Sequence, residues 1–170
     1  GRDRLPLLID VEGHGRERGE DGPDISRTVG WFTSLFPVRF DPTGLDLPKA
    51  MSGGPSAGHA LKRMKAVLRS LPDKGLGYGI LRHLDQDGAD LGDAGHGDIA
   101  FNYLGRISEG GGDSSGWQLA RGVGSGGVDQ EQRRHHLLEV NALLDGDNAL
   151  TVSWSWCRQA HVADSIAGLA

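Results

Sequence analysis

The sequence predicts an α+β fold in which a mixed, mostly antiparallel sheet is covered by helices. Three features support this prediction: about five strand-like runs, one helix with a clear apolar stripe, and a tight turn joining two of the runs. Strands joined by a tight turn pair antiparallel, and a helix with one apolar face needs a second layer to pack against. A chain of 170 residues is long enough for one domain with a substantial core.

The first strand is expected at Leu5–Val11, where an apolar run ends abruptly in EGHGRE, Glu12–Glu17. Two glycines in this segment allow a sharp turn or a close approach of the backbone. Glu12, His14 and Arg16 supply a carboxylate, an imidazole and a guanidinium, which can carry or steady protons. The alternative is a polar strand end that leads into a solvated loop, since structural ion pairs cluster just as densely.

A charged loop at 18–23 separates this strand from the next. Residues Thr28–Phe40 alternate imperfectly and are rich in aromatic and β-branched side chains, which favours a strand over at least part of the range. Trp31 is expected in the core, with the lining of a pocket as the alternative. Asp41–Gly58 contains three prolines and four glycines and is therefore predicted to be a connection.

The clearest helical periodicity follows, and it predicts one buried face formed by Ala60, Leu61, Met64, Val67, Leu68 and Leu71. Ser56 is expected to cap the start of this helix and Pro72 to end it. Basic residues lie mostly away from the apolar stripe: Lys62, Arg63, Lys65 and Arg69. They form either a solvated face or a docking face for an acidic partner protein.

Two glycine-rich segments match phosphate-binding patterns only superficially. Gly75–Gly79 does not follow a strand of a βαβ unit, so a nucleotide site is not expected there. The low-complexity run Gly110–Gly127 is predicted to be a loop. Between them, Ile99–Ile107 predicts a strand that is broken by Gly105.

The last third of the chain predicts a β-hairpin. His136–Leu144 and Leu150–Trp156 both alternate, and the turn residues Asp145–Asn148 join them. Because Trp154 and Trp156 share a face with other apolar side chains, at least one of them is expected in the core. A final helix is expected in the segment 162–170.

Composition excludes several classes of function. The net charge is −5 and no basic stripe is present, so neither nucleic acid nor an anionic membrane is an expected partner. One cysteine, Cys157, excludes an internal disulfide framework and fits a reducing compartment. No run is apolar enough for a membrane span and residues 1–20 do not resemble a signal peptide, so a cytoplasmic location is expected. No metal-ligand spacing appears among the scattered histidines.

The segment DVEGHGRE at Asp10–Glu17 resembles a core motif of the epimerization domains of nonribosomal peptide synthetases. Three further segments match in the family's order: SRTVGWFTSLFPV at Ser26–Val38, PDKGLGYGIL at Pro72–Leu81 and FNYLG at Phe101–Gly105. Four ordered matches make this resemblance specific. It implies a chloramphenicol-acetyltransferase-like lobe, in a fold whose active site is a tunnel between two such lobes.

Domains of this family have two lobes, and the first carries an HHxxxDG motif. The adjacent histidines His135 and His136 are not followed by that pattern, and the motif is absent from the sequence. The resemblance therefore implies that residues 1–170 are the C-terminal lobe of an epimerization domain. We expect a fragment that lacks the N-terminal lobe and the last helices.

The resemblance also implies a reaction, the L-to-D epimerization of the α-carbon of an aminoacyl or peptidyl thioester. Such an isomerase needs proton carriers at the α-carbon and a hydrogen-bond donor near the carbonyl oxygen. In this family the substrate arrives on the phosphopantetheine arm of a peptidyl carrier domain. The expected partners are that carrier domain and the missing N-terminal lobe, and no cofactor or metal of the chain's own is expected.

Site residues follow from the matched motifs. Glu12 holds the acidic position of EGHGRE, for which the family implies an acid/base role. Arg16 is expected to hold Glu12 or an acidic residue of the other lobe, while His14 matches the motif without a distinct mechanism. Asn102 and Tyr103 are candidate donors to the carbonyl or enolate oxygen, and on a regular strand only one of them would face the tunnel.

Two alternatives stay open. The chain could be the corresponding lobe of a condensation domain, an acyltransferase of the same fold that joins two carrier-bound substrates. Condensation domains do not usually carry EGHGRE, so Glu12–Glu17 distinguishes the two classes. The chain could also be a lobe that binds a carrier domain without chemistry of its own.

Overall fold

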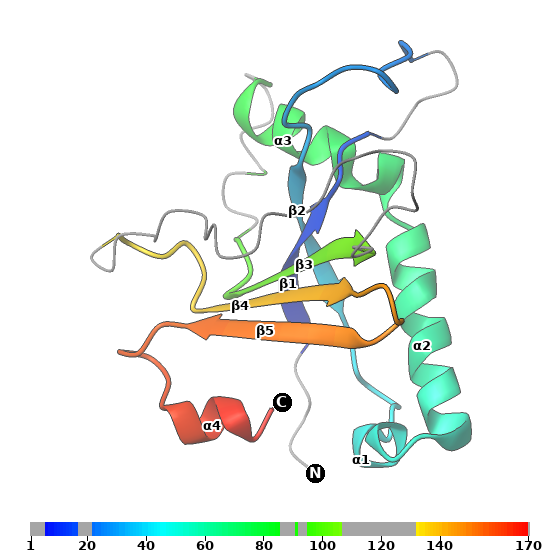
Figure 1. Cartoon of the computed structure of the whole chain (residues 1–170), viewed down its shortest axis with the longest axis vertical. Coiled ribbons are helices and arrows are strands. Elements are labelled where there is room, and N and C mark those ends of the chain that lie inside the picture. The colour runs from blue at the N-terminus through cyan, green and yellow to red at the C-terminus, as the bar shows by residue number, and fades with distance from the viewer. Residues whose placement is uncertain (1–5, 17–21, 86–90, 92–94, 107–131, 170) are drawn as a thin grey trace. The chain divides into compact units, whose positions relative to one another are not determined.

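The computed structural model describes residues 6–16, 22–85, 91, 95–106 and 132–169. The chain divides into two compact units, 1–100 and 101–170, each of which contains strands and at least one helix. Figure 1 shows the elements in chain order. The predicted α+β class is confirmed, and the described residues contain five strands, as expected.

The first unit is built on an antiparallel pair of strands. β1 spans Leu7–Gly13 and β2 spans Ser34–Phe40. Their register places Leu7 opposite Phe40 and Gly13 opposite Ser34. Alternate side chains of β2 are buried, namely Phe36, Val38 and Phe40, as the period of two in a strand requires. Both strands were expected, although β2 begins six residues after the start of the alternating run.

Helices follow β2 in the first unit: α1 Leu47–Met51, α2 Gly54–Arg69, the 3₁₀ turn η1 Pro72–Gly75 and α3 Leu76–His83. Helices α2 and α3 both contact β2, so the unit has a helical layer beside its strands. The predicted connection Asp41–Gly58 does link β2 to the long helix, but it also contains α1 and the first turn of α2.

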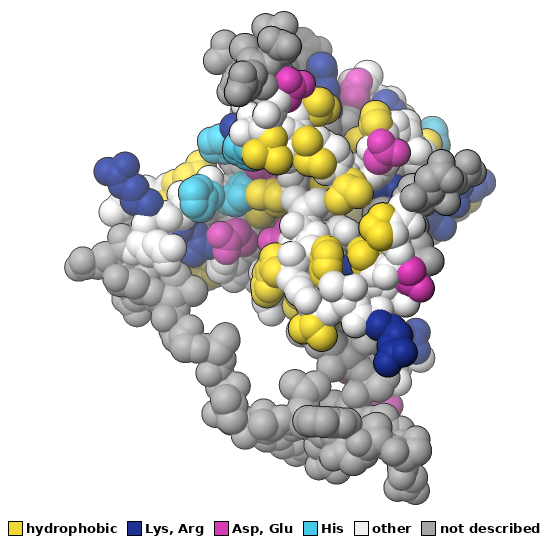
Figure 2. All heavy atoms as spheres, turned by 90° about the horizontal axis from the view of Figure 1, so that it is seen from above, with side chains coloured by type: hydrophobic (Ala, Val, Ile, Leu, Met, Phe, Trp, Pro, Cys, Tyr) yellow, Lys and Arg dark blue, Asp and Glu magenta, His cyan; other side chains and the backbone are white. Residues whose placement is uncertain are grey.

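The ends and the packing of α2 correct the sequence prediction. The helix begins at Gly54 rather than after Ser56, because Pro55 occupies its first turn, where proline lacks only an N–H that would be unpaired anyway. It ends at Arg69, before Pro72. Its apolar stripe is not buried within the described residues, and Leu61 is 64% exposed. The reason is that, among the described elements, α2 contacts only α1 and β2 substantially. Figure 2 likewise shows hydrophobic side chains at the surface of the molecule, interspersed with charged ones.

Phe36 connects three separate segments of the first unit. Its side chain is buried, and its ring lies against Gly75, where a Cβ atom would stand 2.2 Å from the ring. Gly75 also has φ +84°, a conformation that glycine adopts without strain. On its other side the ring approaches Gly13, where an added Cβ would stand 3.2 Å from Cε1. One aromatic ring therefore packs against glycines at the end of β1 and at the start of α3.

The second unit contains the predicted strands of the C-terminal part. β3 spans Ile99–Arg106 and starts at the boundary between the units. β4, Leu138–Leu144, lies between β3 and β5, Leu150–Trp156. β4 and β5 form the predicted antiparallel hairpin, which is visible in Figure 1. The expected break at Gly105 is wrong, because glycine accommodates φ +84° there within the strand.

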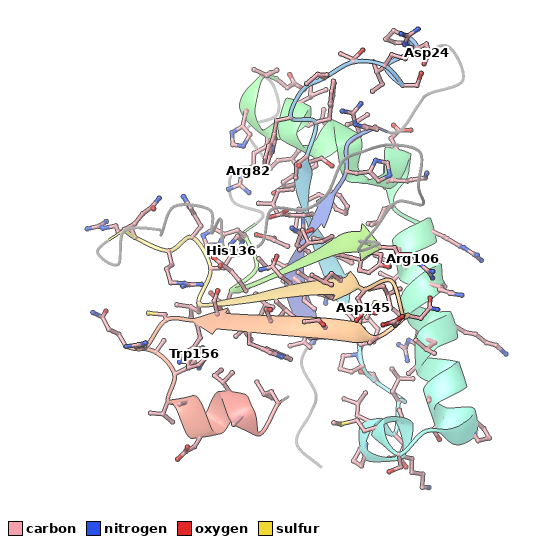
Figure 3. The ribbon with its side chains drawn as sticks, in the orientation of Figure 1. Asp24, Arg82, Arg106, His136, Asp145 and Trp156 are labelled. Carbon is pink, nitrogen blue, oxygen red and sulfur yellow. The ribbon has the colours of Figure 1, made fainter. Side chains whose placement is uncertain are left out.

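The hairpin turn is held by one carboxylate. Asp145 Oδ1 accepts hydrogen bonds from the backbone N–H groups of Asp147, at 3.0 Å, and Ala149, at 2.8 Å. Asn148 adopts φ +63°, which asparagine tolerates better than most residues. Figure 3 labels Asp145 at this turn and Trp156 at the opposite end of β5. The turn expected from the sequence is therefore confirmed, with separate roles for Asp145 and Asn148.

The tryptophans of β5 are half-buried and neither belongs to the buried core, so the expectation of a core tryptophan is wrong for the described residues. Trp154 faces Val140 and Trp156 faces Leu138 across the hairpin, and both β4 partners are buried. The predicted face is thus correct. Burial is incomplete because the outer strand β5 leaves this face partly uncovered, and Leu150 on it is 62% exposed.

The remaining predictions concern short elements. α4, Ala163–Ala167, confirms the C-terminal helix and buries Ile166. Gly75–Gly79 forms the start of α3, so its glycines do not form a phosphate-binding loop. The predicted loop Gly110–Gly127 and most of the charged loop at 18–23 lie outside the described residues. Among the described helices, none has the length and apolar character needed to cross a bilayer.

Candidate active site

The candidate site begins at the C-terminal end of β1. Glu12 is the last residue but one of the strand and lies opposite Leu35 of β2. Its side chain is half-buried, which keeps the carboxylate within reach of solvent or of a ligand. Within the part of the chain that the structure describes, this carboxylate has no hydrogen-bond or ion-pair partner. Glu12 is therefore available for chemistry and is not committed to a structural contact.

The turn after Glu12 depends on a close approach of two backbone segments. Gly15 has φ +63° and is buried against Phe32. An added Cβ atom at Gly15 would lie 1.5 Å from the carbonyl oxygen of Phe32, so no side chain fits there. The second glycine of EGHGRE thus allows the turn to pack directly on the loop that precedes β2.

Arg16, at the end of this turn, forms hydrogen bonds with the loop that precedes β2. Its Nη1 donates hydrogen bonds to the carbonyl oxygens of Ile25 and Thr28, both at 3.1 Å. Its Nη2 donates to Thr28 at 3.1 Å and to Gly30 at 3.5 Å. The guanidinium also stacks on the ring of Phe32, with Cζ 4.4 Å from the ring centroid. The expected contact between Arg16 and Glu12 is absent from the described residues, because the guanidinium is occupied by the loop.

His14 is exposed and is oriented by the backbone. Its Nδ1 accepts a hydrogen bond from the backbone N–H of Arg16 at 3.0 Å. In the neutral imidazole the proton therefore resides on Nε2, since Nδ1 acts as the acceptor. In that tautomer, the N–H donor of His14 is at Nε2.

The loop before β2 carries an unusual apolar surface. The expectation that Trp31 is a core residue is wrong, because its side chain is 90% exposed, and Val29 beside it is fully exposed. These residues precede β2 and have no strand partner, so no described part of the first unit covers them. A surface pocket of about 390 Å³ lies beside them and is lined by Arg16, Ile25, Ser26, Arg27, Thr28 and Val29. Trp31 does not line this pocket, and its role at a substrate site stays a prediction.

Asn102 and Tyr103 lie on β3 in the second unit. Asn102 is half-buried and Tyr103 is 49% exposed, so both side chains remain accessible. Because neighbouring residues of a strand point to opposite faces, we expect the two side chains to lie on different faces of β3. That one of them shares a site with Glu12 stays a prediction.

Asp10 is a structural residue of this region that sequence reasoning missed. Its side chain is only 4% exposed, and Oδ1 accepts a hydrogen bond from the backbone N–H of Gly97 at 3.0 Å. The available signal was a single carboxylate inside an otherwise apolar run, which a buried strand tolerates only when the charge is hydrogen-bonded.

Metal ligation has little support in the described parts of the chain. They contain no group of three or more histidine, cysteine, aspartate or glutamate residues placed to hold a metal ion. The chemistry that these side chains offer is proton transfer by Glu12 and hydrogen bonding by His14, Asn102 and Tyr103.

Comparisons with known proteins identify the family to which the chain belongs. The sequence profile of the Condensation domain family matches residues 4–158. The chain is 40% identical over 169 residues to one of the linear gramicidin synthase proteins of Brevibacillus parabrevis, and 43% identical over 141 residues to bacitracin synthase 3 of Bacillus licheniformis. These alignments cover 96% and 81% of the chain but only 2% of each synthase.

One solved structure shares both fold and sequence with the chain. It is the crystal structure of the epimerization domain from the third module of tyrocidine synthetase B. The two superpose with a TM-score of 0.74 at 32% sequence identity. The similarity covers 96% of this chain and 34% of that domain's chain, so the present sequence corresponds to about one third of it.

Proposed function

The chain belongs to the Condensation domain family of nonribosomal peptide synthetases, and within this family we propose that it is the C-terminal lobe of an epimerization domain. The proposed reaction converts the α-carbon of a carrier-bound aminoacyl or peptidyl thioester from L to D. Similarity to the tyrocidine synthetase B epimerization domain, at 32% identity, supports this function over others in the family. That the similarity covers 34% of that domain supports a second lobe outside this sequence.

The placement of Glu12 is the observation that carries the proposal. Its carboxylate stands at the end of β1, half-buried, and is unpaired among the described residues. A positioned carboxylate that is free of structural contacts can both accept and return a proton. Glycines on both sides of His14 keep bulky side chains out of the turn that follows Glu12.

The proposed chemistry moves one proton in each direction. A base removes the α-proton, and the electron pair of the C–H bond shifts toward the thioester carbonyl to give an enolate. The enolate then takes a proton at the α-carbon from the opposite face, which restores the thioester with inverted configuration. Glu12 exchanges the proton on one face, and the N-terminal lobe supplies the carrier on the other.

A hydrogen-bond donor to the enolate oxygen lowers the barrier of such a step. Asn102 and Tyr103 both carry suitable donors on β3, and their alternation gives this role to one of them. The thioester arrives on the phosphopantetheine arm of a peptidyl carrier domain, so the prosthetic group belongs to the partner. The chemistry asks for no cofactor or metal held by this chain.

The decisive experiment replaces Glu12 by Gln in the complete two-lobed domain. This change keeps the size and hydrogen-bonding capacity of the side chain but removes its ability to carry a proton. We expect exchange of the α-proton into deuterated solvent to slow about 10²–10⁴-fold for one epimer of the thioester and less for the other. Asp98→Asn, which alters an exposed carboxylate of the same unit, is the matched control. Near-normal exchange from both epimers in a folded Glu12→Gln protein would exclude the role.

A condensation-type lobe is the second candidate, because the matching family profile is that of the Condensation domain. Such a lobe would form a peptide bond between two carrier-bound substrates. Supplying a loaded acceptor carrier together with the donor separates the functions. Peptide-bond formation without α-proton exchange would replace the epimerization proposal.

Residues 1–170 alone are predicted to be inactive, because the HHxxxDG motif, which marks the other half of the proposed site, is absent from this sequence. Chiral analysis of a carrier-bound thioester incubated with this chain tests the prediction. Stereochemical conversion well above background would show that a second lobe is unnecessary.

A further inference from the structure

Arg16 is exposed, yet its guanidinium makes several hydrogen bonds to the backbone of one loop. Its two terminal nitrogens carry four N–H groups, and they donate four hydrogen bonds to the carbonyl oxygens of Ile25, Thr28 and Gly30. Because these donors are committed to the backbone, the guanidinium has little capacity left to bind an anionic ligand. Its task is to hold residues 25–30 in place.

The geometry is specific to a guanidinium. A planar fork can donate to two acceptors in parallel while its face lies on an aromatic ring, as it does here over Phe32. An ammonium group is a compact charge that satisfies carbonyl oxygens one at a time and stacks less well. Lysine at position 16 would therefore keep the charge but lose most of the arrangement.

Phe32 connects this contact to the turn that follows Glu12. Its ring lies under Arg16, while its carbonyl oxygen lies where a side chain of Gly15 would be. In addition, the backbone N–H of Arg16 holds His14 at Nδ1. The turn and the loop are thus joined at both the backbone and the side-chain level, a few residues after Glu12.

We infer that Arg16 is a positioning residue, which holds the turn after Glu12 against the loop Ile25–Phe32 and thereby fixes the direction of the Glu12 carboxylate. The contacts of Arg16 with the loop support the structural part of this inference. Its consequence for catalysis rests on the proposed function, since a proton carrier acts only when it is aligned with the reacting carbon.

A structural test uses Arg16→Lys in the complete domain. Without the fork, the loop should open more often, so that trypsin cuts after the exposed Arg27 about 10-fold faster and amides of residues 25–30 exchange faster. Arg69→Lys, which alters an exposed arginine at the end of α2, is the matched control. Unchanged cleavage and exchange in Arg16→Lys would overturn the inference, and so would unfolding of the whole domain, because the proposed role is local.

A kinetic test separates positioning from general stability. In Arg16→Lys, the saturated rate of α-proton exchange should fall about 10–100-fold with little change in KM, because alignment matters mainly in the transition state. In a Glu12→Gln background, Arg16→Lys should cause no further loss, since the two residues act through one group. Multiplicative losses in the double variant would overturn the inference.

Chemical rescue of a variant that lacks the Arg16 side chain completes the test. Guanidinium ions at low millimolar concentration should restore both loop protection and exchange rate in Arg16→Ala, and ammonium ions should not. Failure of guanidinium to restore loop protection would count against the structural part of the inference. If Glu12→Gln proves fully active, the proposed function fails, while the cleavage and amide-exchange results still decide the role of Arg16 in the loop.

Discussion

The buried carboxylate of Asp10 accepts a hydrogen bond from the backbone N–H of Gly97, which lies 87 positions later in the chain. Gly97 approaches β1 so closely that an added Cβ would stand 2.7 Å from the carbonyl oxygen of Leu8. This long-range contact attaches the segment before β3 to the strand that carries Glu12. Both partners belong to the first unit, so the contact stabilises the strand end on which the candidate site depends.

Removing this carboxylate should destabilise the protein. Asp10→Ala leaves the N–H of Gly97 buried without its acceptor, which typically costs about 1–3 kcal/mol. Urea denaturation of the wild type and the variant measures the change in unfolding free energy. Asp98→Ala removes an exposed carboxylate nearby and should have almost no effect. Equal stabilities for Asp10→Ala and the wild type would show that the contact contributes nothing.

Two glycine substitutions should have opposite effects on stability. At Gly15, alanine would adopt a positive φ and collide with the carbonyl oxygen of Phe32, so Gly15→Ala should cost about 1–3 kcal/mol or more. At Gly58, inside α2, a Cβ atom meets open space, and Gly58→Ala should stabilise the helix by roughly 0.5–1 kcal/mol. Thermal melting of both variants gives the comparison. The account of the turn is wrong if Gly15→Ala melts at the wild-type temperature.

The loss of stability on replacing a tryptophan by alanine should depend on where the tryptophan lies. Trp154→Ala and Trp156→Ala remove half-buried rings that face buried β4 side chains, so each should cost about 2 kcal/mol, less than the roughly 3–5 kcal/mol typical of a core tryptophan. Trp31→Ala removes an exposed ring and should change stability by less than about 0.5 kcal/mol. Denaturant midpoints of the three variants test this ranking. A larger loss for Trp31 than for the β5 tryptophans would reverse it.

Acid should selectively weaken the segment after β2. The hydroxyl and the backbone N–H of Thr43 donate hydrogen bonds to Asp41 and hold the pKa of its carboxyl below the ordinary value. A pKa that is lower in the folded state contributes stability above the unfolded pKa of about 3.9, and this stability is lost as pH falls through the folded pKa. The stability difference between wild type and Asp41→Ala should therefore be largest above about pH 5 and shrink in stronger acid. A difference that is independent of pH would contradict this assignment.

Local sequence patterns predicted the elements that depend on local contacts. Asp145–Asn148 forms the expected hairpin turn because its side chains and backbone conformations act within a few residues. The burial of Trp31 was predicted wrongly because its segment has the composition of a strand. In the structure, the carbonyl oxygen of the preceding residue, Gly30, accepts a hydrogen bond from Arg16, which lies in another part of the chain. Periodicity carries no information about a contact of this kind.

For the candidate site, the sequence identified the residues but not their contacts. EGHGRE marked Glu12, His14 and Arg16, and the structure places Glu12 near the end of β1 and the other two residues in the turn that follows it. The sequence could not show whether Arg16 pairs with Glu12. Two opposite charges a few positions apart have the same sequence pattern whether or not their side chains form an ion pair. Asp10 was missed because its partner is a backbone N–H 87 positions away, and no sequence pattern around Gly97 indicates which side chain that N–H meets.

The position of Phe36 has a consequence for engineering hybrid synthetases. Its ring fills the space that Gly13 and Gly75 leave open, so three sequence blocks share one complementary fit. A chimaera that imports only one of these blocks from a relative risks pairing a large ring with a side chain in place of a glycine. Crossover points should therefore lie outside the range 13–75, so that the three positions are inherited as a set.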